Sequence, residues 1–140
     1  IDTLNETEPE GRADFGRALG EYAATIGSRS LVVVVSDFVG ELEGIEDGID
    51  ALADNYLRLV CTMSHDELEL PVAGDTIFEG IETEGSLRTF ISNRTRKGYR
   101  ERLEGHLEEV EEHAESRGAG YVLVDTDDDF FDSFARAWPE

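Results

Sequence analysis

Five consecutive apolar residues, Leu31 to Val35, run directly into Ser36 and Asp37, and four of the five are β-branched valines. A strand that is apolar on both faces is typical of a parallel sheet covered by helices on both sides. In such folds, ligands bind beyond the carboxyl ends of the strands. The sequence therefore predicts a buried parallel strand that presents a hydroxyl and a carboxylate at the edge where α/β domains hold their chemistry.

The rest of the chain alternates between helical and strand patterns. Apolar residues at helical spacing predict helices in four stretches: 15–26, 42–52, 99–114 and 130–138. Apolar runs predict further strands at 56–63 and 121–124, and segments 76–81 and 86–91 around a turn at 82–85 predict a hairpin. This order predicts a three-layer α/β fold with a mostly parallel sheet, helices on both faces and a small β-hairpin.

Residues 1–140 are expected to form a single α/β domain, with 1–12 as a flexible lead-in. Residues 64–75 are predicted to be a loop. Ser92 or Asn93 is expected to cap the longest helix, and Asp127 or Asp128 the last one. Three parallel strands are few for a sheet of this kind. We therefore expect a fragment of a longer protein, or a sheet edge that a partner completes.

The charge of the chain is extreme. There are 33 Asp and Glu against 12 Lys and Arg, which gives a net charge of −21, and Lys97 is the only lysine. An acidic, lysine-poor composition is similar to that of proteins from salt-loving archaea. We favour solvation as the role of these acids, with an acidic face for a basic partner as the alternative. The charge argues against nucleic-acid binding, because phosphate contacts need a positive surface.

Cys61 is the only cysteine, and it lies inside an apolar run, so we expect a buried thiol. A lone cysteine excludes a disulfide framework and a cysteine metal site, and it suits a reducing cytoplasm. No apolar run is long enough to span a membrane and no signal peptide opens the sequence, so we expect no membrane contact by this chain itself.

Polar residues follow each predicted parallel strand: Ser36-Asp37, Ser64-His65-Asp66-Glu67 and Asp125-Thr126-Asp127. Because parallel strands end at one edge of a sheet, these groups are expected to lie along the same edge. Oxygen ligands in such an arrangement suit Mg²⁺. Ser, Asp and Thr also commonly cap the helix that follows a strand, and we favour capping over a metal site.

Three other groups of side chains each have two interpretations. His106 and His113 do not have a metal-binding spacing, so we expect exposed polar side chains. Aromatic residues of the last helix form either a partner-binding face or, as we favour, part of the core: Phe130, Phe131, Phe134 and Trp138. Half of the cations either dock an acidic partner or, as we favour, pair with neighbouring acids: Arg88, Arg94, Arg96, Lys97, Arg100 and Arg102.

Several stretches match motifs that occur together in one known family: Gly11–Phe15 with Ala18 and Leu19, Arg29–Phe38, His65–Pro71, Gly80–Gly85 and the helix from Tyr99. The chain resembles the C-terminal half of a von Willebrand A-like domain. More narrowly, it resembles a bacterial and archaeal family of unknown function, the fifty-eighth of the domain-of-unknown-function series. The expected fold is then a partial von Willebrand A-like, or Rossmann-like, sheet.

This resemblance implies a metal-ion-dependent adhesion site built from three motifs. The first, Asp-x-Ser-x-Ser, is absent from this chain, and the second, a threonine, falls on Ala13. The third falls on Asp37, which is the one metal ligand that the resemblance carries over. Mg²⁺ is accordingly expected only in a longer parent protein, and no catalytic or cofactor-binding residue is assigned.

The resemblance also implies a partner. Members of this family tend to be encoded beside MoxR-type AAA+ ATPases, and longer members often carry membrane segments ahead of this region. We therefore expect a non-enzymatic interaction module that works with such an ATPase in chaperone-like assembly. It is expected to be cytoplasmic, either alone or tethered to a membrane through preceding segments of a longer parent. Whether it forms a homo-oligomer is left open. The expected partner-binding residues are Ser36, Asp37, Asp66, Arg94, Arg96 and Lys97.

The alternative function is a metal-dependent hydrolase that uses Asp37, Asp66 and Asp125 together with His65. It requires these four side chains to converge, because two-metal sites span only about 4 Å.

The net charge predicts that stability depends on salt. We expect the melting temperature to fall as KCl is lowered from about 3 M to about 0.1 M, because the Debye length grows to about 10 Å and the acids repel one another unscreened. Thermal unfolding across this range measures the effect. A constant melting temperature would show that the charge argument is wrong.

Overall fold

Three parallel strands form the main sheet of the computed structural model, which describes residues 14–68, 74–79, 86–91 and 93–138. Strand β1 (Leu31–Ser36) pairs with the central strand β2 (Tyr56–Met63), which pairs in turn with β5 (Gly120–Asp125). Strands β3 (Gly74–Glu79) and β4 (Ser86–Ile91) form a separate antiparallel pair. The expected parallel sheet and hairpin are therefore both present.

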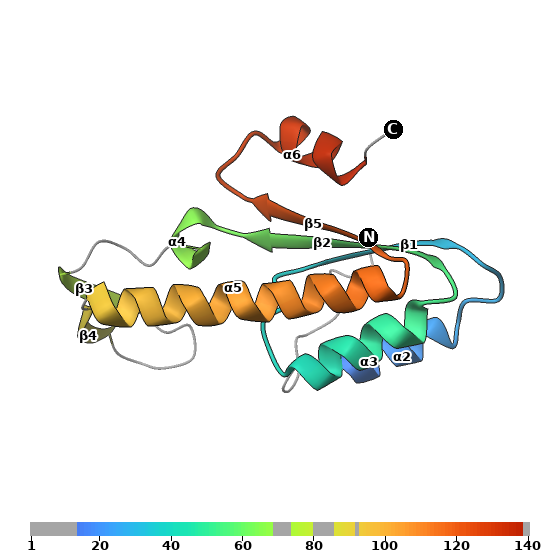
Figure 1. The fold of residues 1–140 in the computed structure, drawn as a ribbon, viewed down its shortest axis with the longest axis horizontal. Coiled ribbons are helices and arrows are strands. Elements are labelled where there is room, and N and C mark those ends of the chain that lie inside the picture. Colours follow the sequence, from blue (N-terminus) through green and yellow to red (C-terminus); the bar gives the residue numbers. More distant parts are fainter. Residues whose placement is uncertain (1–13, 69–73, 80–85, 92, 139–140) are drawn as a thin grey trace.

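The described helices are α2 (Phe15–Ala23), α3 (Leu42–Leu52), α4 (His65–Leu68), α5 (Asn93–Ser116) and α6 (Phe130–Ala137). Figure 1 shows α2, α3 and α5 on one side of the main sheet and α6 on the other, with the hairpin beside the N-terminal end of α5. The predicted α/β class, with a parallel sheet flanked by helices, is confirmed.

The core lies between the main sheet and the layer of α3 and α5. Alternate residues of β2 face this layer and are buried, as are Ile49 of α3 and Val110 of α5, which have no exposed surface. Cys61 is one of the β2 residues on this face, so the expected buried thiol is confirmed. The apolar stripes read from the sequence thus meet one face of the sheet.

Glycines allow α2 to pack closely on α3. A Cβ atom on Gly16 would lie 2.8 Å from the carbonyl oxygen of Gly44, and one on Gly48 would lie 2.9 Å from a methyl carbon of Leu19. Both distances are shorter than real Cβ contacts. The glycines that interrupt the apolar stripe of α3 are therefore where the two helices cross.

Strand β1 is not buried on both faces, contrary to the expectation from its apolar run. Val32 is buried against the helical core, but Val35 on the opposite face is 63% exposed. The prediction was wrong because a strand's composition shows that both faces are apolar without showing what covers them. Within the described residues, α6 packs over β5 on this side of the sheet and leaves β1 bare.

The aromatic residues of α6 are also not part of the core. Phe130, Phe131 and Phe134 are more than half exposed, and Trp138 is 37% exposed. They stack along the helix surface instead, with ring centroids of Phe134 and Trp138 4.8 Å apart. Core packing, the interpretation favoured from the sequence, was therefore wrong for this helix.

Two helix starts differ from the sequence-based expectation. Residues 64–75, expected to be a loop, contain α4 and the start of β3. Helix α4 forms because Ser64 and Glu67 make a capping box, in which Glu67 Oε2 accepts from the Ser64 N–H at 2.7 Å. Helix α6 is capped by Asp129, not by Asp127 or Asp128, since its carboxylate accepts from Phe131 N–H and Asp132 N–H. Helix α2 also ends at Ala23, a turn before Ile26.

An ion-pair network joins α3 to the C-terminal end of α5. Arg117 donates to both carboxylate oxygens of Asp50 at 2.7 and 2.9 Å, and His113 Nε2 lies 2.8 Å from Asp50 Oδ1. Burial by itself raises the pKa of Asp50, but the hydrogen bonds from His113 and Arg117 outweigh it and hold the pKa below its ordinary value of 3.8. His113 is only 19% exposed, so it is not the exposed side chain expected from the sequence.

We expect Asp50→Asn to lower the free energy of unfolding at pH 7 by about 1 kcal/mol or less, because the partners are partly exposed. A lowered carboxyl pKa stabilises the fold above the unfolded-state pKa, and this stabilisation is lost as pH falls through the folded-state pKa. The difference from the unsubstituted chain should therefore shrink below about pH 4. Chemical denaturation at pH 7 and at about pH 3 measures it, with exposed Asp54→Asn as the control. An equal loss at both pH values would contradict the network's role.

Candidate functional site

The turn after β1 is held by its own polar side chains. Ser36 Oγ accepts from Phe38 N–H at 3.1 Å, and Asp37 Oδ1 accepts from Val39 N–H at 3.0 Å. Both are side-chain bonds to the backbone two residues ahead, a common way for Ser and Asp to shape a turn. Helix capping, the role favoured from the sequence, was therefore wrong for Ser36 and Asp37, because they hold the turn and the N-cap position of α3 is Glu41.

Phe38 has a left-handed backbone conformation, with φ of 50°, although its side chain is 1% exposed. A bulky residue in this region is strained, and such residues persist only where their surroundings hold them. The ring of Phe38 packs edge-on against Phe15 at 5.5 Å, and its carbonyl oxygen lies 2.7 Å from His106 Nε2. His106 is therefore a half-buried partner of the turn, not the exposed side chain expected from the sequence.

Cys61 fixes the same turn from the central strand. Its Sγ lies 3.5 Å from the carbonyl oxygen of Asp37. Burial raises the pKa of Cys61 to about 11, so the sulfur stays a thiol at neutral pH and donates to that carbonyl. The carboxyl end of β1 is thus held by β2 and α5 together.

The carboxyl ends of β2 and β5 come together beside the turn that follows β1. His65 Nδ1 lies 3.5 Å from Asp125 Oδ2, and the His65 N–H donates to Asp127 Oδ2 at 3.3 Å. Asp125 in turn accepts from the Asp127 N–H at 2.9 Å. Two of the four residues of the hydrolase hypothesis, His65 and Asp125, are therefore neighbours at this edge.

The other two residues of that hypothesis are not joined to this pair. In the described part of the chain, no hydrogen bond or ion pair joins the side chain of Asp37 or Asp66 to that of His65 or Asp125. Among residues 14–68, 74–79, 86–91 and 93–138, no three His, Cys, Asp or Glu side chains are placed to hold a metal ion. Ala13, the position of the second adhesion motif, lies outside the described residues.

A hollow of about 650 Å³ lies at the carboxyl end of β1, between the starts of α2 and α3. Its polar lining includes Asp14, Asp37 and Glu41. Asp14 caps α2 by accepting from the Arg17 N–H at 2.9 Å. This hollow is acidic, and it includes the residues that the family resemblance singled out at β1.

The start of α5 carries the basic surface. Arg94, Lys97 and Arg102 line an open hollow of about 560 Å³, and Lys97 pairs with Glu101 at 3.8 Å. The Tyr99 hydroxyl donates to the Glu67 carbonyl at 2.8 Å, which ties this end of α5 to α4, the helix that carries Asp66. The side chain of Arg88 lies outside the described residues. Expected partner-binding residues of both charges therefore lie on two connected helices.

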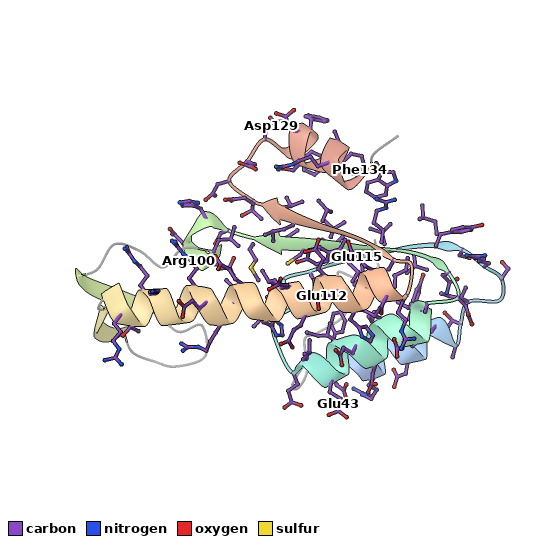
Figure 2. The ribbon with its side chains drawn as sticks, viewed as in Figure 1. Glu43, Arg100, Glu112, Glu115, Asp129 and Phe134 are labelled. Carbon is purple, nitrogen blue, oxygen red and sulfur yellow. The ribbon has the colours of Figure 1, made fainter. Side chains whose placement is uncertain are left out.

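An apolar groove is a surface of which the sequence reasoning gave only one side: the aromatic residues of the last helix were the alternative partner-binding face, and the sheet face that lines the groove with them was not foreseen. The groove has a volume of about 370 Å³ and lies between α6 and the uncovered face of the sheet. Its lining is mostly apolar and includes Val33, Val35, Val60, Val124, Phe134 and Trp138. Figure 2 shows Phe134 on α6, on the side of the sheet opposite α5. The sequence features that indicate this groove are the apolar run of β1 and the aromatic residues four positions apart, at 130, 134 and 138.

These features define an α/β domain with a parallel sheet, an acidic edge at the strand ends and an apolar groove on one face. The chain belongs to the family described as protein of unknown function DUF58, which matches residues 1–109. Strand β5 and helix α6 lie beyond that match. No curated protein and no solved structure matches the chain.

None of the helices in the described ranges is both long enough and apolar enough to cross a membrane. The longest, α5, is 24 residues long but carries many charged side chains, among them Arg100, Glu112 and Glu115 in Figure 2.

We expect His106→Ala to lower the free energy of unfolding by about 1–3 kcal/mol, because the Phe38 carbonyl loses its partner. His106→Gln, which keeps an N–H donor, should recover part of this loss. Urea denaturation measures both, with exposed His65→Ala as the control. Equal losses for the alanine and glutamine variants would show that the hydrogen bond does not hold the turn.

Proposed function

We propose that the chain is a non-enzymatic interaction module of von Willebrand A-like type that works with a MoxR-type AAA+ ATPase in chaperone-like assembly. The observation that carries this proposal is the apolar groove, because contiguous apolar surface on a folded domain marks a binding site for another molecule. Membership of the DUF58 family is compatible with this function and does not define it.

The polar surfaces give the proposed module two further contact regions. The acidic hollow at the end of β1 holds Ser36 and Asp37, and the basic start of α5 holds Arg94 and Lys97. Opposite charges in separate regions orient a partner and raise the rate of encounter. We place the protein in the cytoplasm of a salt-loving archaeon, with any membrane tether in other segments of a longer parent.

The second candidate is the metal-dependent hydrolase. The contact of His65 with Asp125 favours it, because an imidazole beside a carboxylate is a pair of groups that can take part in general acid–base catalysis. A Mn²⁺ titration followed by NMR line broadening in about 2 M KCl discriminates the two functions. Selective broadening at Asp37, Asp66 and Asp125 would support the hydrolase, and diffuse broadening over the acidic surface would support the interaction module.

We expect the tagged chain to co-purify with the MoxR-type ATPase encoded beside it, at about 1 M KCl or above, where the acidic surface is screened. Combined Arg94→Gln and Lys97→Gln should reduce recovery several-fold when the experiment is repeated at about 0.1 M KCl, where the Debye length is about 10 Å, because this removes two of the three cations that line the basic hollow. Glu112→Gln, an exposed change further along α5, is the matched control. Absence of the ATPase from the purified unsubstituted chain would count against the proposed function.

A further inference from the structure

Two arginines near the start of α5 make no ion pair, although the chain is strongly acidic. In the basic hollow, Lys97 pairs with Glu101 at 3.8 Å. Among the residues that the structure describes, neither Arg94 nor Arg102 forms a hydrogen bond or an ion pair. Acidic residues outnumber basic ones by 33 to 12. Pairing with neighbouring acids, the interpretation favoured from the sequence, therefore does not hold for these two arginines.

Gly98 lies between the two arginines on one face of the helix. Arg94, Gly98 and Arg102 follow one another at every fourth position, so the two arginines are about 12 Å apart along the helix axis. A Cβ atom on Gly98 would lie 3.5 Å from Nη1 of Arg102. The Arg102 guanidinium therefore reaches back over the glycine. Arg94 lies one helical turn before the same glycine, at the other side of the gap.

Helix stability does not explain this arrangement. A glycine inside a helix is destabilising relative to alanine, and the 3.5 Å contact at Gly98 is an ordinary one that a side chain tolerates. Cations in the first turns of a helix also face the positive end of its dipole, which is unfavourable. Residues that work against local stability are expected at functional sites. Gly98 thus leaves a gap between two arginines that have no anionic partner.

The guanidinium groups define the chemistry of a ligand for this gap. A planar guanidinium donates two parallel N–H bonds to a carboxylate or a phosphate, which an ammonium group cannot do. The hollow of about 560 Å³ is lined by α5 alone: Arg94, Thr95, Lys97, Gly98, Glu101 and Arg102. Sites for small molecules bury most of the ligand, which one helix surface cannot do. The hollow therefore suits an anionic group that a larger partner presents.

We propose that Arg94 and Arg102 form a clamp for a glutamate-rich helix of a partner protein. One carboxylate of that helix lies over Gly98, between the two guanidinium groups. Charge complementarity favours this occupant, because the hollow holds three cations and one carboxylate. The cations recur at helical spacing, which matches glutamates placed every three or four residues on a second helix. This inference rests on the proposed interaction function and names the chemistry of the partner segment.

Fluorescence anisotropy of labelled peptides tests the clamp on the whole chain. The probes are two alanine-based helices of equal length, one with glutamate and one with glutamine at every fourth position, and tripolyphosphate as a competitor. At about 0.3 M KCl the Debye length lies between about 10 Å and about 3 Å, so distant acids are screened more than groups in contact. We expect the glutamate helix to bind at least about tenfold more tightly than the glutamine helix.

A glycine substitution separates the shape of the clamp from general charge attraction. Gly98→Leu keeps the net charge, favours the helix and fills the gap between the arginines. We expect it to weaken binding of the glutamate helix at least about fivefold. Gly105→Leu is the matched control, because Gly105 lies further along α5 with nothing within 4 Å of its Cβ position. This control should leave binding unchanged.

An arginine substitution separates the planar guanidinium from its charge. Arg102→Lys keeps the charge and removes the paired N–H donors, so we expect binding to weaken at least about fivefold. Arg17→Lys, an exposed change on α2, is the control and should leave binding unchanged. Thermal unfolding of all four variants checks that each one is folded.

Three outcomes would overturn the inference. They are equal binding of the glutamate and glutamine helices, equal effects of Gly98→Leu and Gly105→Leu, and tripolyphosphate that binds more tightly than the glutamate helix and loses its binding in Gly98→Leu. The last outcome would assign the clamp to a phosphate ligand.

Failure of the proposed function is distinguishable from failure of the clamp. If the ATPase does not co-purify while the glutamate helix binds and Gly98→Leu weakens it, the proposed function fails and the clamp is supported. If the ATPase co-purifies equally with the unsubstituted chain and with Gly98→Leu, and the glutamate helix does not bind, the clamp fails and the proposed function is supported.

Discussion

The packing of α3 and α5 against one face of β2 is the contact on which the other parts of this structure depend. Ile49, Leu59 and Val110 have no exposed surface at this interface, and among the described strands only β2 has a neighbour on each side. Parallel strands contribute little stability by themselves, so the buried apolar surface of this layer holds β1 and β5 in place. The opposite face of the sheet has no comparable layer over β1 and β2 within the described residues.

The same core fixes the polar edge of the sheet. His106 lies one position before buried Leu107 on α5, and Cys61 lies between buried Leu59 and Met63 on the same face of β2. Both therefore reach the turn after β1 from rigid elements. They bond to the carbonyls of Phe38 and Asp37, which leaves the Asp37 carboxylate at the surface. The left-handed conformation of Phe38 is held by its buried ring and by these bonds. Placement of the candidate site therefore follows from core packing.

The alternation of helices and strands could be predicted from the sequence because apolar periodicity is a local signal. The capping box of Ser64 and Glu67 was also local, and it was missed because α4 has a single turn. What covers β1 and α6 could not be predicted. The apolar pattern of Val33, Val35 and Phe134 is the same whether a helix, a partner or solvent lies over it. The contact of His65 with Asp125 joins segments 60 residues apart and depends on strand register, which a single sequence does not give.

The two kinds of proposed contact respond to salt in opposite ways. Pairing through Arg94 and Lys97 is electrostatic and weakens as the Debye length falls to about 3 Å near 1 M salt. Docking in the groove buries Val35 and Phe134, and the attraction between apolar surfaces is not screened. High salt also reduces the repulsion that a chain of −21 exerts on an acidic partner. In the proposed saline setting, we therefore expect the groove to supply the affinity and the charged regions to contribute mainly to orientation.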